Sequence, residues 1–356
     1  MLQTNKLYTD ENLVDTYVQK KNKCTKQTIW FTAICSLVSV FAIIVILCCT
    51  LMKKQSSNII PQDLTANIAY AHRGFMLDTS RKFFPVSTIL ALLDMMAANK
   101  LNVFHWHFSD SQSFSIQWSY NSTSINGADY YSLADVSQVI AKAASLNIEV
   151  IPEFEMPGHS DIFGIKFPSI ISGIPDVNNP QAEMNLKSPD LKPMITTLLK
   201  DFLSAAKPFN ASKRVHLGAD EVAMIWPDTN PKATYTSFEN SYLLPKVKSF
   251  GKTAIVWNDP ITSQSLALSK EFTIQVWTGT SELSSVLSKG YKAIVSTSQE
   301  WYIGNATPEK IANYVLDSSQ IIGAEVVWFT SPGDDPVDIS WLEPVIVAAG
   351  KKLNGL

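Results

Sequence analysis

The chain has 356 residues and a net charge of −3, with 46% apolar and 17% charged residues. This composition supplies a sizeable core and excludes a disordered chain, and the slight negative charge argues against a nucleic-acid-binding protein, which needs a basic face. The four cysteines all lie at or before position 49, as Cys24, Cys35, Cys48 and Cys49. The large remainder of the chain therefore forms no disulfide and no cysteine zinc site.

The first 69 residues have the pattern of a membrane anchor followed by a linker. Residues 1–27 are polar and end in a group of lysines, whereas residues 28–52 contain no charged residue. Such a segment is long enough to span a bilayer as a helix and longer than the apolar region of a cleaved signal peptide. The lysines before it predict a cytosolic tail at 1–27, a single transmembrane signal anchor at 28–52 and a linker at 53–69. The protein would then be a single-pass type II membrane protein whose large C-terminal part is lumenal or extracellular.

Three N-glycosylation sequons follow the predicted anchor. They begin at Asn121, Asn210 and Asn305. They fit a glycoprotein whose large domain is lumenal or extracellular, although such triplets also arise by chance.

From residue 70 onward, short apolar strands alternate with helical stretches. The predicted strands are 70–77, 102–107, 148–153, 213–217, 253–257, 272–276, 292–296 and 321–328. The predicted helices are 86–99, 132–146, 190–206, 235–250, 280–289, 308–317 and 338–349. This alternation predicts an α/β fold, a (β/α)8 TIM barrel over residues 70–356. The long connections at 108–131 and 154–189 are expected to be functional.

In such a barrel the chemistry lies at the C-terminal ends of the strands. The polar and aromatic residues expected there are Arg73, His105, His107, Asp110, Glu153, Glu155, His159, Asp220, Glu221, Trp257, Trp277, Tyr302 and Trp328. Acids, histidines and tryptophans on one rim suit a sugar ring, which needs polar partners at its edge and flat apolar surfaces at its faces. The pattern therefore predicts a carbohydrate site.

The adjacent acids Asp220 and Glu221 have two interpretations. They follow Gly218 and Ala219, small residues that let a ligand approach the backbone closely, and could contact two parts of one substrate. They could equally open a helix, with Asp220 as its N-cap and Glu221 in its first turn.

The other rim residues also have plainer interpretations. A lone Trp or His at a strand end is more often structural, and Arg73 could pair with an acid inside the barrel. His105 and His107 could hold zinc, but no third ligand is obvious, so we predict no metal and no cofactor.

Longer motifs occupy several segments of the barrel. They are HRGFMLDTSR at 72–81, NKLNVFHWH at 99–107, DSQSF at 110–114, PGH at 157–159 and HLGADE at 216–221. Their sequence and order resemble those of glycoside hydrolase family 20, the β-N-acetylhexosaminidases, over about residues 70–330. The resemblance covers the barrel domain only.

The resemblance implies catalytic roles at the matching positions. Glu221 looks like the general acid, and Asp220 like the residue that orients and polarises the substrate's 2-acetamido group. In this family the acetamido oxygen attacks the anomeric carbon, so the retaining reaction needs no protein nucleophile. Asp110 and His159 resemble the pair that tunes the proton affinity of the acid.

The resemblance also implies the residues that bind substrate. These are Trp257, Trp277 and Trp328 as walls of the acetamido pocket, Tyr302 as donor to the acetamido oxygen, and Arg73 as a ligand of sugar hydroxyls. Gly304 and Thr330 depart from the pattern, because the family usually has acids there that hold hydroxyls on the far edge of the sugar.

The sequence thus predicts hydrolysis of terminal non-reducing β-linked N-acetylglucosamine or N-acetylgalactosamine from glycoconjugates. The departures leave two alternatives: a weakly active or inactive sugar-binding protein on the same barrel, or a hydrolase for a modified or extended glycan. The expected partners are N-acetylhexosamine-terminated glycans and a membrane. The sequence leaves the oligomeric state open, a dimer included.

Overall fold

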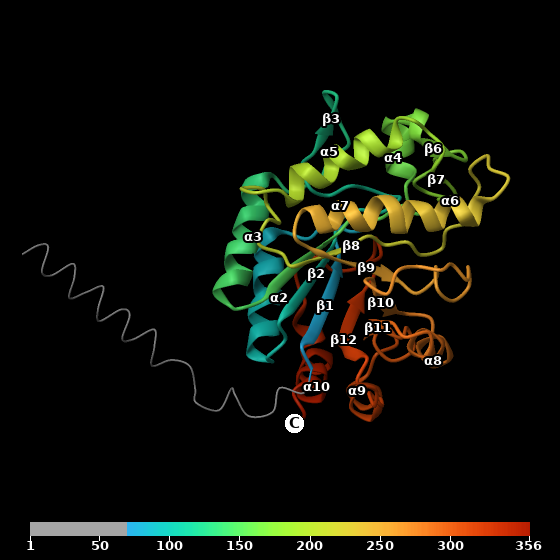
Figure 1. The fold of residues 1–356 in the computed structure, drawn as a ribbon. Helices are drawn as coiled ribbons and strands as arrows, with labels where there is room; N and C mark the ends of the chain where they lie inside the picture. The colour runs from blue at the N-terminus through green and yellow to red at the C-terminus, as the bar shows by residue number, and fades with distance from the viewer. Residues whose placement is uncertain (1–69) are drawn as a thin grey trace, which may run out of the picture. The chain divides into compact units, whose positions relative to one another are not determined.

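A computed structural model describes residues 70–356 (Figure 1). The predicted anchor at 28–52, with its tail and linker, lies outside the described residues. Among the helices of the described part, none has both the length and the apolar character of a membrane span.

Eight parallel strands close a barrel in the order β1-β12-β11-β10-β9-β8-β5-β2. Their bounds are β1 His72–Asp78, β2 Val103–His107, β5 Glu149–Glu153, β8 Arg214–His216, β9 Thr253–Trp257, β10 Thr273–Val276, β11 Lys292–Val295 and β12 Ile321–Trp328. Each agrees with its predicted range to within two residues at either end. The (β/α)8 prediction is confirmed.

Helices cover the outside of the barrel (Figure 1). They are α2 Val86–Ala98, α3 Leu133–Ser145, α5 Leu191–Leu203, α6 Pro231–Ser237, α7 Leu244–Ser249, α8 Thr280–Ser288, α9 Pro308–Asn313 and α10 Glu343–Leu353. The helix predicted at 235–250 begins earlier, at Pro231, because Asn230 caps it and proline suits its first position. A π-helical turn, η2 Phe238–Leu243, joins α6 to α7.

The two long connections fold into small elements on the rim. The first contains the hairpin β3 Ser119–Tyr120 with β4 Thr123–Ser124. The second contains α4 Asp161–Lys166, the 3-10 turn η1 Pro168–Ile170, and the hairpin β6 Ile171–Ser172 with β7 Glu183–Met184. These elements extend from the rim of the barrel beside the C-terminal ends of β2, β5 and β8.

The barrel interior changes character from one end to the other. Val103, Ile151, Ile255 and Ile294 form an apolar cluster inside it. Further along the same strands β2, β5 and β9, the inward positions carry His105, Glu153 and Trp257, all buried. The polar groups buried inside the barrel therefore lie toward its C-terminal end, where the site was predicted.

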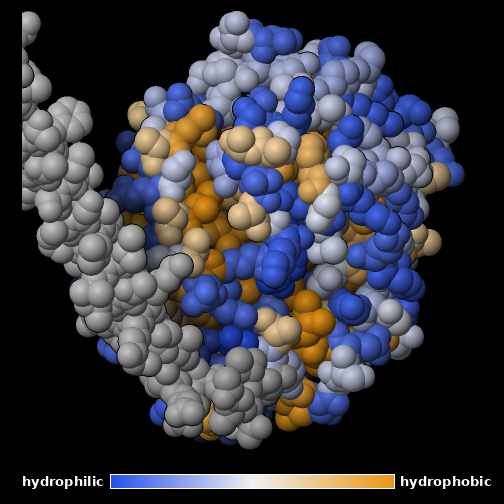
Figure 2. Space-filling model, turned by 60° about the vertical axis from the view of Figure 1, so that its left-hand side comes forward, coloured by the Kyte–Doolittle hydropathy of each residue, from blue (hydrophilic) through white to orange (hydrophobic). Residues whose placement is uncertain are grey.

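On the outer surface, Figure 2 shows apolar residues in narrow strips between hydrophilic ones.

Candidate active site

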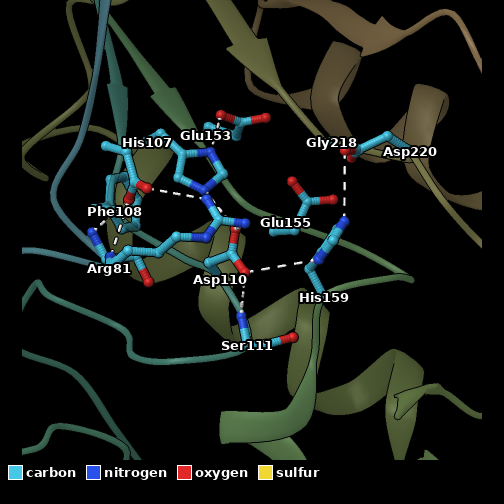
Figure 3. A network of polar contacts seen from close by, with 12 residues as sticks. Arg81, His107, Phe108, Asp110, Ser111, Glu153, Glu155, His159, Gly218 and Asp220 are labelled. Carbon is cyan, nitrogen blue, oxygen red and sulfur yellow. Dashed lines mark hydrogen bonds and ion pairs between the residues drawn. The ribbon is translucent and has the colours of Figure 1, made fainter. Parts of the chain in front are cut away.

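The loops after β2, β5 and β8 bring together the four residues predicted to be catalytic. Figure 3 shows three of them, Asp110, His159 and Asp220. His159 lies at their centre. Its Nε2 is 3.4 Å from Glu221 Oε2 and 3.5 Å from Asp220 Oδ2, and its Nδ1 is 3.7 Å from Asp110 Oδ1. One imidazole thus connects three carboxylates, Asp110 from the loop after β2 and the adjacent Asp220 and Glu221 from the loop after β8.

The electrostatics of His159 follow from this arrangement. Burial opposes a charge on the ring, but the carboxylates of Asp220, Glu221 and Asp110 raise the pKa of His159 well above its usual value. The ring is therefore an imidazolium at neutral pH. It partly neutralises two adjacent acids that would otherwise repel each other.

Asp220 and Glu221 differ in exposure. The Glu221 side chain is 59% exposed, whereas that of Asp220 is 14% exposed and its Oδ1 is buried without a hydrogen-bond partner. No helix starts here, since the next one begins at Pro231 and Glu221 has a positive φ of 52°. The helix-cap interpretation is therefore wrong for this pair.

Gly218 makes room for a protein side chain rather than for a ligand. A Cβ at this position would lie 1.9 Å from Glu155 Oε1, and its φ of +67° also favours glycine. Burial, followed by the carboxylates of Asp220 and Glu153, raises the pKa of Glu155 well above its usual range. Glu155 is thus a neutral acid packed behind Asp220.

Two of the three predicted pocket walls, Trp257 and Trp277, lie together with the predicted donor Tyr302 beside Asp220. Trp257, Trp277 and Tyr302 belong to one apolar cluster with Met76, Val327 and Phe329. Trp277 Nε1 donates to Asp259 Oδ2 at 2.7 Å, which fixes the indole. Burial, and then Asp220, raise the pKa of Tyr302 well above its usual value, so its hydroxyl remains a donor.

Trp328, the third predicted wall, does not face this cluster. Its ring packs edge-on against Phe84 and Trp341 in the layer outside the barrel. Side chains alternate along a strand, so Val327 and Phe329 point inward while Trp328 points outward. Phe329 takes the inner place, 5.6 Å from the Tyr302 ring and 6.1 Å from that of Trp257. This corrects the assignment of Trp328 as a wall.

Arg73 also lies away from the site. It is near the start of β1, and its guanidinium donates to the backbone oxygens of Lys100 and Tyr70 at 2.8 and 2.6 Å. The N-terminal ends of the strands are opposite the rim that carries the catalytic candidates. This corrects the assignment of Arg73 as a sugar ligand.

Arg81, which follows the C-terminal end of β1, is the arginine at the rim. Its Nη1 lies 2.9 Å from Asp78 Oδ2 and its Nη2 lies 2.7 Å from Asp110 Oδ2, with the guanidinium 5.0 Å from the Phe329 ring centroid. The sequence already contained the signal, because Arg81 comes after the strand whereas Arg73 comes at its start.

The two departures from the family pattern have different surroundings. Gly304 is exposed and an added Cβ would meet nothing within 4 Å, but its φ is +99°. Thr330 is buried, and its hydroxyl donates to the Asp78 backbone oxygen at 3.0 Å. Thr330 therefore supports the loop that carries Asp78 and Arg81.

A second, buried group of histidines and glutamates lies beneath the rim. Glu153 Oε1 is 2.8 Å from His216 Nδ1 and accepts a 2.9 Å hydrogen bond from Trp257 Nε1, while its Oε2 contacts His105 and His107. His107 Nε2 in turn lies 2.9 Å from Asp110 Oδ2. Although burial opposes it, Glu153 raises the pKa of His107 to about 10. His107 is thus a fixed cation behind Asp110.

Some of these groups are close enough together to hold a metal ion. Within residues 70–356 the sets are His105 with Glu153 and His216, His107 with Glu153 and Glu155, and His159 with Asp220 and Glu221. Ion pairs among their own members hold the first and third sets together, and in the second set His107 pairs with Glu153.

The comparisons with known proteins agree with this geometry. The family model "Glycosyl hydrolase family 20, catalytic domain" matches residues 70–332. Beta-hexosaminidase subunit A1 of Dictyostelium discoideum is 30% identical over 282 residues, 73% of this chain and 51% of that protein. The human beta-hexosaminidase subunit beta is 31% identical over 257 residues, 66% of this chain and 45% of that protein.

Solved structures agree on the fold. A chitobiase of Flavobacterium johnsoniae has a TM-score of 0.64 at 24% identity, covering 79% of this chain and 48% of that one. The chain spans about half the length of the curated relatives it matches. Because the family model covers most of its residues, the chain belongs to glycosyl hydrolase family 20.

Proposed function

We propose that this protein hydrolyses terminal β-linked N-acetylhexosamine from the non-reducing ends of glycoconjugates, with retention of configuration. Family membership supports the reaction class, and the acid, histidine and aromatic groups at one rim supply the chemistry it needs. The substrate class is supported by Asp220, Trp257, Trp277 and Tyr302, which the family resemblance assigns to the 2-acetamido group and which lie near one another at this rim.

Glu221 is the general acid of the proposed reaction. Its exposed carboxyl can reach the glycosidic oxygen and donate a proton as the bond from that oxygen to the anomeric carbon breaks. His159, backed by Asp110, holds Glu221 in place and supplies positive charge when Glu221 becomes a carboxylate. Glu221 then accepts a proton from the water that attacks the anomeric carbon in the second step.

Asp220 carries the argument for a substrate-assisted mechanism. Its buried Oδ1 accepts no hydrogen bond in the geometry of the structure, and the single proton of the neutral Glu155 behind Asp220 leaves the carboxylate able to accept from a further donor. An acetamido N–H would satisfy it. The acetamido oxygen would then attack the anomeric carbon to give an oxazolinium intermediate, held between Trp257, Trp277 and Tyr302.

The test is turnover of an aryl N-acetyl-β-glucosaminide and the matching galactosaminide by the purified full-length chain. Replacing Asp220 by Asn should lower kcat/KM by about 10²–10³-fold, since the charged partner of the acetamido group is lost. A thiazoline mimic of the intermediate should inhibit the parent far better than the free sugar does. Sugar binding without turnover would favour the alternative, a sugar-binding protein on the same barrel.

We propose in addition a type II topology, with the anchor at 28–52 holding the domain on the lumenal or extracellular side. The lysines before the anchor support this, and the three sequon asparagines Asn121, Asn210 and Asn305 are all exposed on the domain. In a eukaryotic host at least one should carry a glycan. Protease treatment of intact microsomes should spare the domain, and digestion without detergent would reverse the orientation.

A further inference from the structure

A groove of about 610 Å³ lies next to the candidate active site and has no role in the chemistry described so far. Glu221 and His159 line one end of it, whereas Asp220 does not line it. In the proposed reaction Glu221 protonates the leaving oxygen and Asp220 holds the acetamido group. The groove therefore lies on the side of the leaving group, the aglycone.

Hydrogen bonds of Asp161 hold part of the groove lining to the loops that carry the catalytic candidates. Asp161 is buried, and its Oδ1 accepts from the backbone N–H groups of Asp176 and Ala182 at 2.9 and 3.1 Å. Its Oδ2 accepts from the Ser111 hydroxyl at 2.7 Å, next to Asp110. The loop between β6 and β7 is thus anchored to the same segment that carries a catalytic candidate.

Glu183 on β7 anchors another part of the lining, the segment that contains Ala223 and Ile225, in a similar way. Its Oε2 accepts from the Ala223 backbone N–H at 3.0 Å, and its Oε1 accepts from that of Ile225. An added Cβ at Gly173 would lie 3.0 Å from Ile225 Cδ1, so the 221–225 segment lies directly against the hairpin. A preformed groove of this kind can bind a ligand without first ordering its own loops.

Two isoleucines stand exposed in the groove lining. Ile174 is 84% exposed and Ile225 is 45% exposed. The lining also carries the acids Asp161, Glu183 and Glu221, and no Lys or Arg occurs among the residues that form it. His159, its one cationic side chain, is already surrounded by Asp110, Asp220 and Glu221. The groove offers apolar contact and hydrogen bonds but no free positive charge.

We propose that this groove is the aglycone site, and that it selects an uncharged sugar unit with an apolar group, such as an acetamido methyl, against the two isoleucines. An anionic aglycone, such as a glucuronate, would find no Lys or Arg in the lining and would lie beside the exposed carboxyl of Glu221, so it is disfavoured. This inference rests on the proposed hydrolase function and adds the specificity of its leaving-group side.

The experiment compares three substrates with the full-length chain. They are N-acetylglucosaminyl fluoride, which has no aglycone body, the β-linked disaccharide of N-acetylglucosamine, and N-acetylglucosamine β-linked to glucuronate. Ile174→Ser with Ile225→Ser should lower the kcat/KM ratio of disaccharide to fluoride by about five- to twentyfold. Ile165→Ser is the matched control, because Ile165 is 48% exposed on α4 but does not line the groove, and it should keep the parent ratio.

A charge variant provides the second arm. Ile225→Lys should raise kcat/KM for the glucuronate substrate relative to the disaccharide, whereas Ile165→Lys should not. Absence of turnover on the fluoride would refute the hydrolase function and the aglycone site with it. Turnover on the fluoride with the same substrate ratios in parent, groove variants and controls would overturn the aglycone site alone. Better turnover of an octyl glycoside than of the disaccharide would overturn the sugar as its occupant.

Discussion

The rim of the barrel has two halves that differ in how their side chains are fixed. The acid half comprises the loops after β2, β5 and β8, with Asp110, His159, Asp220 and Glu221. Its members contact one another directly through His159. The aromatic half comprises the ends of β9 to β12 and of β1, with Trp257, Trp277, Tyr302, Phe329 and Arg81. Its apolar surfaces pack together, and its polar atoms bond to acids outside the group rather than to one another.

This difference suggests a division of labour. Groups that exchange protons or meet developing charge act mostly in the transition state, whereas apolar walls bind ground state and transition state alike. Changes in the acid half should therefore lower kcat, and changes in the aromatic half should mainly raise KM. The following variants test that division from the largest expected effect to the smallest.

Glu221→Gln should have the largest effect, a fall in kcat of about 10²–10⁴-fold on substrates with poor leaving groups. A leaving group that needs no proton, such as fluoride, should be affected far less. Circular dichroism and thermal melting of the variant serve as the folding control. A parental rate on a disaccharide substrate would remove Glu221 from the role of acid.

Arg81→Met and Arg73→Met form a matched pair from the two ends of β1. Arg81 contacts Asp78 and Asp110 at the rim, so its loss should raise KM or lower kcat/KM by about 10–100-fold, the equivalent of one or two charge-assisted hydrogen bonds. Arg73 bonds only to backbone oxygens among its side-chain contacts, so its loss should lower the melting temperature without changing KM. The reverse pattern in Michaelis–Menten kinetics would restore Arg73 as the sugar ligand.

Phe329→Ala and Trp328→Ala test which of the two side chains at the end of β12 faces the barrel interior. Phe329 faces Tyr302, so its truncation should raise KM by about three- to tenfold with a smaller change in kcat. Trp328 is buried in the outer layer, so its truncation should cost about 3–5 kcal/mol of unfolding free energy and leave the KM of the folded fraction unchanged. Denaturant titration and kinetics on the same samples separate the two. A larger KM effect for Trp328 would show that it lines the pocket after all.

The acid half was predictable because its residues lie in short motifs directly after strands. Asp110, His159 and the pair at 220–221 needed only the strand ends to be placed correctly, and hydrophobic patterning located those within two residues. The aromatic half depends on which face each side chain takes. Trp328 and Phe329 are neighbours at the end of β12, so an error of one residue in the alignment selects the side chain that faces outward. The motif at 72–81 runs from the start of β1 to beyond its end, so its first arginine, Arg73, was chosen in place of Arg81.

Other features could not be read from local sequence at all. The contact of Glu155 with Gly218 joins the loops after β5 and β8, and the group of Glu153 with His105, His107 and His216 joins three strands. Buried acids and histidines give no periodic signal in the sequence. Only the closed barrel shows which of them come into contact. The anchor at 28–52 remains a prediction from composition.

The smallest expected effect concerns Asp259, which joins the two halves. Its Oδ2 accepts from Trp277 Nε1 at 2.7 Å and its Oδ1 accepts from the Glu221 backbone N–H at 3.4 Å. Burial, and then the nearby Asp220, raise the pKa of Asp259 to about 6. The folded state thus holds a proton that the unfolded chain has already released between about pH 4 and pH 6.

Because the folded state binds more protons in this window, unfolding free energy should fall as the pH rises through it, by about 1–3 kcal/mol from this group. Asp259→Asn removes the titration while keeping an oxygen acceptor for Trp277, so its unfolding free energy should be flatter from pH 4 to pH 6.5. Urea titrations at several pH values would measure this, with the exposed Asp129→Asn as control. If the parent and Asp259→Asn show parallel pH profiles, Asp259 does not couple the halves through its charge. The link between Trp277 and the Glu221 loop would then rest on the hydrogen bonds of Asp259 and not on its titration.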